Sequence, residues 1–255
     1  MDRRVALVLL ALAPARAAAQ SAAPTVAAAA DLKFALDEVA ARFGRETGHT
    51  IRLVFGSSGH LTTQILQGAP FHMFMSADED FVFRLADAGK TQDRGRAYAV
   101  GRIGIIVPPG SPLKPDGELK DLAAALMDGR LRKFAIAHPD HAPYGMRARE
   151  ALQHVGLWEA IRPRLVYGEN IAQTAQFATS GSTQGGIIAQ SLALAPAIAS
   201  SGRFALIPQA WHRPLRQRMV LLKDAPPEIR AFHDYISTAD AQNIMRRHGF
   251  EMPVN

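Results

Sequence analysis

Apolar and polar positions along the chain follow two alternating patterns, one typical of buried strands and one of amphipathic helices. Short apolar runs at residues 24–30, 50–56 and 71–77 predict strands, and each is followed by a segment with apolar side chains at helical spacing. In the first such segment these side chains recur at the i, i+3, i+4, i+7 positions of one helix face: Leu32, Ala35, Leu36, Val39, Ala40 and Phe43.

The alternation continues to the end of the chain. Strands are predicted within 101–112, 133–139, 164–170, 184–194, 203–208 and 217–224, with helices at 119–129, 145–156, 171–181 and within 226–250. Strands that alternate with helices imply parallel sheets covered on both faces. These units are too many for one small sheet, so we expect two doubly wound α/β lobes with a cleft between them.

We place the two crossings between the lobes near Gly101 and Pro208. Lobe I is then expected to span residues 24–101, with 212–255 returning to it, and lobe II to span residues 102–211.

The N-terminus has the pattern of a secretory signal peptide. Two arginines precede the apolar run at residues 5–13, and small residues follow at the spacing of a cleavage site. We expect cleavage after Ala19, with Ala17 as the other suitable position. The run is too short to anchor the mature protein in a membrane. The sequence therefore predicts an exported protein.

Composition and charge narrow the functions further. The chain has no cysteine, which excludes thiol catalysis, disulfides and thiolate metal sites. Cleavage after Ala19 would remove Arg3, Arg4, Arg16 and Asp2 and lower the net charge from +6 to +4. The basic residues are dispersed, and export argues against nucleic acid as a partner.

Several predicted strands end in loops that carry hydroxyls and free backbone N–H groups and that lead directly into helices. Ligands of open α/β sheets bind at such carboxyl ends. The first turn of a helix has unpaired N–H donors and the positive end of the helix dipole. Several such ends directed into one cleft would hold an anion without a cationic side chain. The loops are Ala30-Asp31, Gly56-Ser57-Ser58-Gly59, Pro143-Tyr144-Gly145 and Glu169-Asn170-Ile171.

At residues 26–43, 55–79, 138–159 and 233–250 the sequence resembles the periplasmic molybdate-binding proteins of molybdate ABC transporters. The resemblance covers nearly the whole chain after the signal peptide. It implies the type II periplasmic binding protein fold, no enzymatic activity and no cofactor. The implied ligand is molybdate, and tungstate with it. The implied partner is an inner-membrane ABC permease, and we expect a periplasmic monomer.

The resemblance also assigns site residues. Ser58 falls on a binding serine of the family, with Ser57 behind it, and we expect Gly56 and Gly59 to give the backbone clearance to approach the anion. Tyr144 would contribute its backbone N–H and its hydroxyl, and Ile171 its backbone N–H.

The first binding loop departs from the family pattern. It has Ala30 and Asp31 where the family usually has a serine or a Thr-Asn pair. A carboxylate close to a dianion would repel it. We therefore favour Asp31 as the cap of its own helix, accepting from the N–H of Lys33 or Phe34, while main-chain N–H groups face the ligand. The alternative is that Asp31 accepts a proton from a protonated oxyanion and alters selectivity.

Three other functions remain as alternatives. Phosphate, sulfate or an organic anion would use the same helix ends. A secreted serine hydrolase would use Ser57 or Ser58 with His60, but a histidine two residues after Ser58 points away from it on a helical turn. His138, Asp140 and His141 suggest a metal site, although a solvated polar loop explains them better, so we predict no direct cation ligands.

Overall fold

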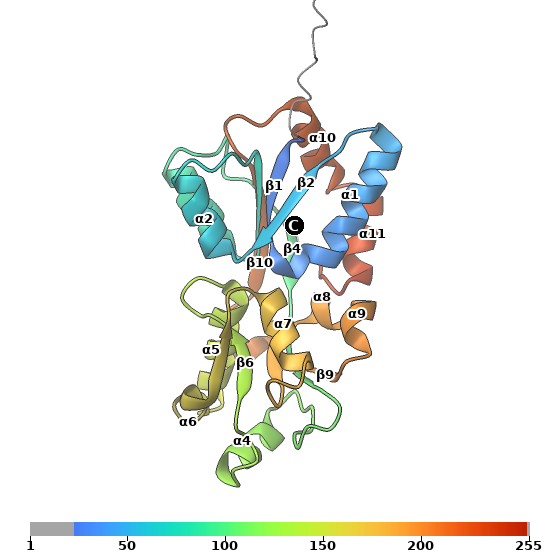
Figure 1. The fold of residues 1–255 in the computed structure, drawn as a ribbon. Coiled ribbons are helices and arrows are strands. Elements are labelled where there is room, and N and C mark those ends of the chain that lie inside the picture. The colour runs from blue at the N-terminus through green and yellow to red at the C-terminus, as the bar shows by residue number, and fades with distance from the viewer. Residues whose placement is uncertain (1–22, 254–255) are drawn as a thin grey trace, which may run out of the picture.

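The computed structural model describes residues 23–253, which form two lobes stacked end to end, each built on one five-stranded sheet (Figure 1). The predicted signal peptide, residues 1–19, lies outside the described residues. In the part of the chain that the structure describes, no helix is long and apolar enough to cross a membrane.

Lobe I has the strand order β2-β1-β3-β10-β4. The strands are β1 (Thr25–Ala29), β2 (Arg52–Gly56), β3 (Met73–Ser76), β4 (Arg96–Gly101) and β10 (Leu215–Leu221). Successive residues of β1 face opposite sides of the sheet. Val26 and Ala28 pack under α1 (Lys33–Thr47), α10 (Pro227–Tyr235) and α11 (Ala239–Arg247). Ala27 packs under α2 (Ser58–Leu66) and α3 (Glu79–Asp87). Helices therefore cover both faces.

Lobe II has the strand order β7-β6-β8-β5-β9. Its strands are β5 (Ile103–Val107), β6 (Phe134–Ala137), β7 (Leu165–Gly168), β8 (Gly186–Ala189) and β9 (Arg203–Leu206). Its α-helices are α4 (Lys120–Met127), α5 (Pro143–His154), α6 (Trp158–Ile161), α7 (Ile171–Thr179), α8 (Gln190–Ala193) and α9 (Pro196–Ala199). Short 3-10 turns lie at Ala30–Leu32, Arg162–Arg164 and Gln209–Trp211.

Both sheets are mixed, so the expectation of parallel sheets is wrong for one strand in each lobe. β10 runs antiparallel to β3 and β4, and β5 runs antiparallel to β8 and β9. Both β5 and β10 begin where the chain has just crossed from the other lobe, so they start at the junction. The parallel strands end there. For this reason β5 and β10 run opposite to the parallel strands.

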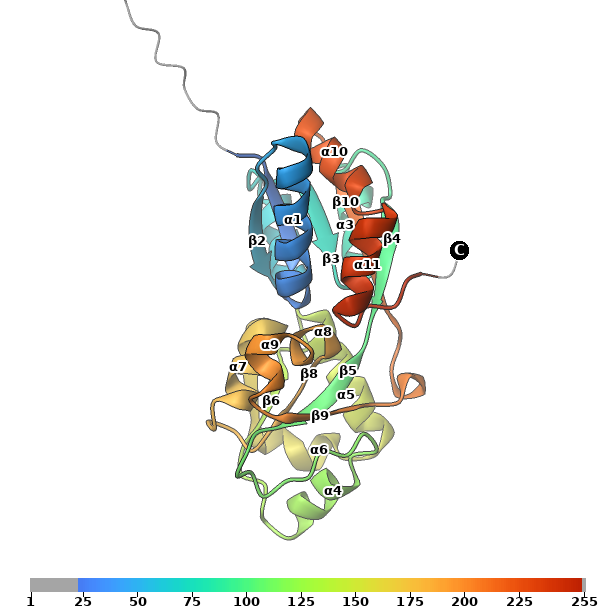
Figure 2. The same ribbon diagram turned by 90° about the vertical axis from the view of Figure 1, so that its right-hand side faces the viewer.

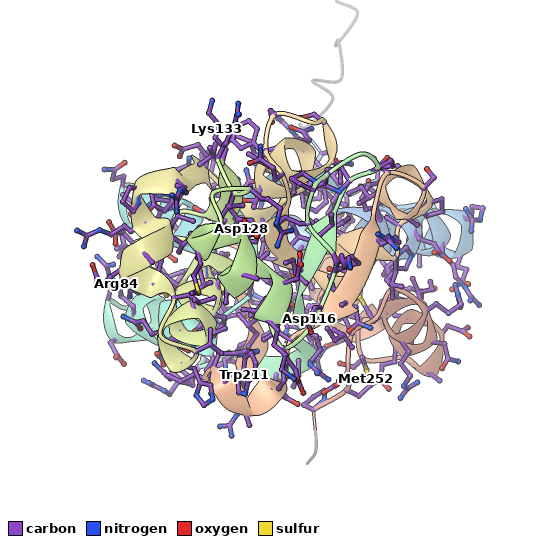
Figure 3. All side chains as sticks on the ribbon, turned by 90° about the horizontal axis from the view of Figure 1, so that it is seen from below. Arg84, Asp116, Asp128, Lys133, Trp211 and Met252 are labelled. Atoms are coloured by element: carbon purple, nitrogen blue, oxygen red, sulfur yellow. The ribbon has the colours of Figure 1, made fainter. Side chains whose placement is uncertain are left out.

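The parallel strands of both lobes direct their carboxyl ends at the junction, and α1, α2, α5 and α7 begin beside it (Figures 1 and 2). Side chains tipped with nitrogen and with oxygen are spread over the whole outline seen from the lobe II end, with Lys133 and Asp128 among them (Figure 3).

Candidate functional site

A narrow cavity of about 10 Å³ lies between the lobes. All six residues that the sequence singled out for binding line it, and the role of each as an anion ligand stays a prediction. Lobe I contributes residues at the ends of β1, β2 and β3, and lobe II contributes residues at the starts of α5 and α7. The lining residues are Ala29, Ala30, Asp31, Gly56, Ser57, Ser58, Ala77, Ala142, Pro143, Tyr144 and Ile171.

Three helices begin at this cavity: α2 at Ser58, α5 at Pro143 and α7 at Ile171. The N–H groups of a first helical turn have no partner within the helix. The sequence enforces each start locally. Ser57 caps α2, Pro143 sets the first position of α5, and Asn170 caps α7 by accepting from Ala172 and Gln173 at 3.0 Å each. The backbone N–H groups of Ser58, Tyr144 and Ile171 are among the donors left at the cavity.

The two serines of the β2–α2 loop have different environments. Ser58 is fully buried, and its Oγ accepts the N–H of Ala77 at 3.0 Å, so its hydroxyl hydrogen remains available to a ligand. The Ser57 Oγ accepts the N–H of His60 at 3.4 Å and lies 3.0 Å from Nδ1 of His141. Ser58 is therefore the stronger hydroxyl donor for an anion.

Asp31 is the centre of a buried polar network. Its Oδ2 accepts the Tyr144 hydroxyl at 2.9 Å and the Gln217 amide at 2.7 Å, and Gln217 Oε1 accepts the hydroxyl of Tyr98 at 2.7 Å. The backbone carbonyl of Asp31 accepts the hydroxyl of Ser191 at 2.8 Å. Tyr144 and Ser191 belong to lobe II, so both bonds join the lobes.

The favoured interpretation of Asp31 as a helix cap is wrong. Among the described residues its carboxylate accepts from Tyr144 and Gln217, and the first helical turns after it have no side-chain cap. Its second oxygen, Oδ1, is buried and has no partner within residues 23–253. One side of the Asp31 carboxyl is thus held by protein donors, while the other side is left unpaired.

Burial raises the pKa of Asp31 from 3.8 to about 6, against the opposing effect of its bonds from Gln217 and Tyr144. The carboxyl therefore takes up a proton near pH 6, well above the range of an ordinary aspartate. Burial, with the nearby Asp31 charge, also raises the pKa of Tyr98 and Tyr144 well above its usual value, so both hydroxyls remain donors.

The expected clearance role of the loop glycines is wrong for Gly59. Its N–H donates to the carbonyl of His141 in the other lobe at 2.9 Å, and a Cβ at Gly59 would lie 2.6 Å from that oxygen. A Cβ at Gly56 would meet the Leu61 side chain instead. Gly59 thus allows the two lobes, rather than a ligand, to approach closely.

The serine of this loop does contact a histidine, but not the one beside it in sequence. His60 is half exposed and lies 3.6 Å from Glu169, whereas the partner of Ser57 is His141, 84 residues further along. In a hydrolase the histidine would bond a carboxylate at its other nitrogen. Within the described residues, the hydrogen bond of the His141 ring goes to Ser57. This pair is therefore not a triad.

Sequence reasoning missed Gln217, Tyr98 and Ser191. A signal existed for Gln217, because it lies between Leu215 and Met219 on the inward-facing positions of β10. A polar side chain on the buried face of a strand requires a partner. Tyr98 and Ser191 gave no comparable signal, since their roles depend on contacts with distant segments.

Comparison with known proteins agrees with this geometry. The family model for bacterial extracellular solute-binding proteins matches residues 24–251. The chain is 34% identical to the molybdate-binding protein ModA of Rhodobacter capsulatus, over 88% of this chain and 86% of that protein. It is 33% identical to ModA of Azotobacter vinelandii, over 91% of each.

A solved structure of the Azotobacter vinelandii periplasmic molybdate-binding protein superimposes with a TM-score of 0.82 at 27% identity, covering 91% of this chain and 100% of that one. These relatives are solute-binding proteins and not enzymes. The match also extends through both lobes and the segments that join them. The chain therefore belongs to the family of bacterial extracellular solute-binding proteins.

Proposed function

We propose that this protein binds molybdate in the cavity between its lobes. The observation that carries the proposal is the convergence of the first turns of α2, α5 and α7 on one cavity. Of the eleven described residues that line it, none carries a positively charged side chain. Such a site holds an anion by N–H and hydroxyl donors alone. The matched relatives are molybdate-binding proteins, which supports molybdate as the anion.

Ser58, Tyr144 and Ile171 are the proposed principal ligands. Each would donate its backbone N–H, and Ser58 would add its hydroxyl. The Tyr144 hydroxyl, which was expected to meet the ligand, donates to Asp31 instead. A tetrahedral dianion has acceptor oxygens in four directions and donates no hydrogen bond. Donors at the starts of three helices therefore suit a tetrahedral dianion. Tungstate has the same charge and shape, so it should bind to the same donors.

Asp31 has a second part in the proposal. Asp31 lines the cavity, its Oδ1 is buried without a partner within residues 23–253, and burial raises the pKa of the carboxyl to about 6. A bound dianion would raise that pKa further, because it disfavours a second negative charge nearby. The protonated carboxyl then donates to the anion, with Oδ2 still held by Tyr144 and Gln217. Ala30 contributes a small side chain and leaves room beside it.

Asp31 also favours a second candidate ligand. Phosphate carries a proton near neutral pH, and an ionised Asp31 would accept it through the unpartnered Oδ1. Sulfate has no proton to offer and would depend on a protonated Asp31, as molybdate does. Phosphate is thus the specific alternative, and it differs from molybdate in requiring the ionised carboxylate.

The biological role follows from the family. We propose that the protein is exported through the signal peptide at residues 1–19 and works in the periplasm as a monomer. It would deliver its anion to an inner-membrane ABC permease. Closure of the lobes over the anion would create the surface that the permease contacts. The hinge is proposed at Gly101-Arg102 and in residues 207–214, where the chain passes between the two sheets.

Calorimetric titration of the anion-free protein with molybdate, tungstate, sulfate and phosphate tests the proposal. We expect tight binding of molybdate and tungstate with one anion per chain. Phosphate binding without molybdate binding would contradict the ligand assignment.

A further inference from the structure

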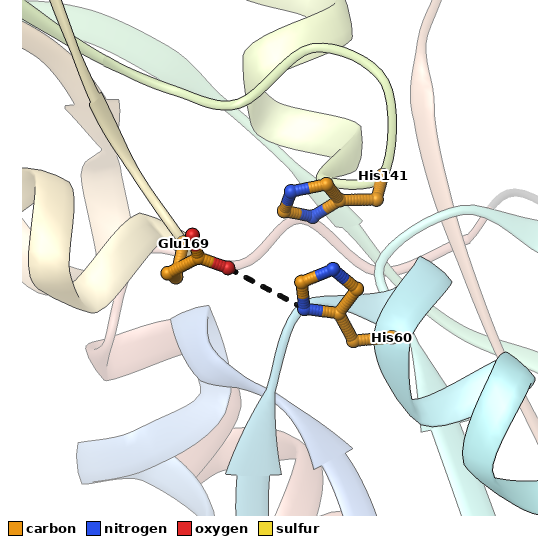
Figure 4. Close-up of side chains that lie close together, drawn as sticks. All are labelled: His60, His141 and Glu169. Atoms are coloured by element: carbon orange, nitrogen blue, oxygen red, sulfur yellow. Dashed lines mark ion pairs between the residues drawn. The ribbon is translucent and has the colours of Figure 1, made fainter.

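Three metal-ligating side chains meet between the lobes, outside the residues that line the cavity. They are His60 in α2 of lobe I, His141 in the loop before α5, and Glu169 in the loop before α7 (Figure 4). One ligand atom of each lies within 4.8 Å of the others. His60 Nδ1 is 3.6 Å from Glu169 Oε2, and the rings of His60 and His141 stack with centroids 3.8 Å apart. The cluster therefore joins the lobes.

The chemistry of this set is specific. Two imidazoles and one carboxylate are a common three-residue ligand set for Zn²⁺, with water completing the coordination. Imidazole ligands also suit Cu²⁺ and Ni²⁺, whereas Ca²⁺ and Mg²⁺ require oxygen ligands. The single negative charge of Glu169 offsets part of the charge of a divalent ion. A soft or borderline divalent ion thus matches the site, and a hard one does not.

The surroundings of His141 support a metal-binding orientation. The Ser57 hydroxyl lies 3.0 Å from Nδ1 of His141 and occupies that nitrogen, which leaves Nε2 to face an ion. A hydrogen bond to the other ring nitrogen is the usual way in which metal-binding histidines are oriented. His138 stacks on His141 with centroids 4.9 Å apart and restricts the ring from another side.

The geometry requires the exposed ligands to rearrange when the ion binds. Ligands of a tetrahedral zinc ion lie about 3.3 Å apart when each is about 2 Å from the metal. Nitrogen lone pairs also lie in the ring plane, so the His60 ring must rotate out of its stack with His141 for both histidines to face one ion. The side chains of His60 and Glu169 are 49% and 65% exposed, which leaves both free to move and leaves a path for the ion from solvent.

We propose that His60, His141 and Glu169 bind one divalent transition-metal ion, with Zn²⁺ as its representative, across the mouth of the closed cleft. One ligand belongs to lobe I and two to lobe II, so the complete set exists only when the lobes are together. The ion stabilises the closed form by its differential affinity for the two states. This inference does not depend on which anion the cavity holds.

Calorimetric titration of the untagged, anion-free protein with ZnCl2 tests the site. We expect one Zn²⁺ per chain, with affinity lowered at least about tenfold in His60→Ala and in Glu169→Gln. Both side chains are exposed, so neither change should disturb folding, which circular dichroism checks. His49→Ala removes an exposed histidine at the far end of α1 and serves as the control that leaves Zn²⁺ binding unchanged. Mg²⁺ should not compete.

Small-angle X-ray scattering tests the link between the lobes. Zn²⁺ should lower the radius of gyration of the anion-free protein, and His60→Ala should abolish that change. The proposal is overturned if Zn²⁺ does not bind, if it binds equally to the His60 and Glu169 variants, or if the radius of gyration stays constant. A protein that binds Zn²⁺ but not molybdate would contradict the proposed function and leave this metal site standing.

Discussion

Tyr144 of lobe II donates its hydroxyl to Oδ2 of Asp31 in lobe I at 2.9 Å, across 113 residues of sequence. Both side chains are at most 2% exposed. The bond fixes one oxygen of the carboxyl, while Oδ1 is buried without a partner within residues 23–253, and Asp31 lines the cavity. Asp31 therefore bonds the two lobes together, and its protonation sets the charge that a ligand meets.

Molybdate affinity should depend on pH through Asp31. If the bound form carries a proton on this carboxyl, affinity is full below the pKa of about 6 and falls as the pH rises above it. The expected loss reaches about tenfold per pH unit. Titrations from pH 5.5 to 8.5 measure it. Asp31→Asn, whose amide donates at every pH, should bind molybdate with an affinity that does not change with pH. An affinity independent of pH in the unaltered protein would contradict the proposal that protonated Asp31 donates to the anion.

The same substitution should change stability. Because the folded pKa of about 6 exceeds the ordinary value of 3.8, the folded state binds the proton more tightly than the unfolded state does. Stability from this group is complete below about 3.8 and is lost as the pH rises through 6. At pH 7.5 the ligand-free Asp31→Asn protein should be more stable by up to about 3 kcal/mol.

Urea unfolding of both proteins at several pH values measures this difference, which should shrink toward zero near pH 4. A variant that is less stable than the parent at pH 7.5 would show that the ionised carboxylate, with its bonds from Tyr144 and Gln217, is worth more than its burial costs.

Ser58→Ala should weaken anion binding far more than Ser57→Ala. The Ser58 hydroxyl has a free hydrogen at the cavity, and a hydrogen bond to a charged group contributes about 1.5–3 kcal/mol, or roughly ten- to a hundredfold in affinity. The Ser57 oxygen is already engaged with His60 and His141, so its loss should cost about 1 kcal/mol of stability as a missing cap. Calorimetry and thermal unfolding separate the two effects, and equal affinities for Ser57→Ala and Ser58→Ala would refute the assignment.

Gly59→Ala should impair closure of the lobes without destabilising the fold. The new methyl group would lie 2.6 Å from the His141 carbonyl in the closed form, but an open cleft removes that contact. Alanine in α2 favours the helix by up to about 1 kcal/mol. We expect an unchanged or higher melting temperature together with at least about a tenfold loss of anion affinity. Gly44→Ala, a helical glycine of α1 that meets only His49 of its own lobe, is the matched control and should bind normally.

The sequence predicted every described strand except β4, Arg96–Gly101, because periodicity reports which side chains of a segment are buried. It also located the cavity, since strand ends of one sheet edge must lie together. It did not predict the direction of β5 and β10, because direction depends on where a crossing delivers the chain. No local pattern carries that information.

Asp31 shows the same limit at the scale of one residue. Local rules favoured a cap for the helix that follows it. The side chain is instead held by Tyr144 and Gln217, which are 113 and 186 residues away. A short-range preference worth about 1 kcal/mol was outweighed by a buried network of three hydroxyls and an amide around that residue.

The donors proposed for the anion are mostly main-chain amides, and this affects how the site tolerates change over evolution and in the laboratory. The side chain of Ile171 packs in the core of lobe II, and only its N–H is proposed to meet the ligand. Any side chain of suitable volume can occupy that position without altering the donor, so an alanine substitution would report on packing and not on the ligand contact. Ile171→Pro deletes the amide hydrogen at a first helical position that accepts proline. A loss of anion affinity in Ile171→Pro would therefore identify the backbone N–H as a ligand contact.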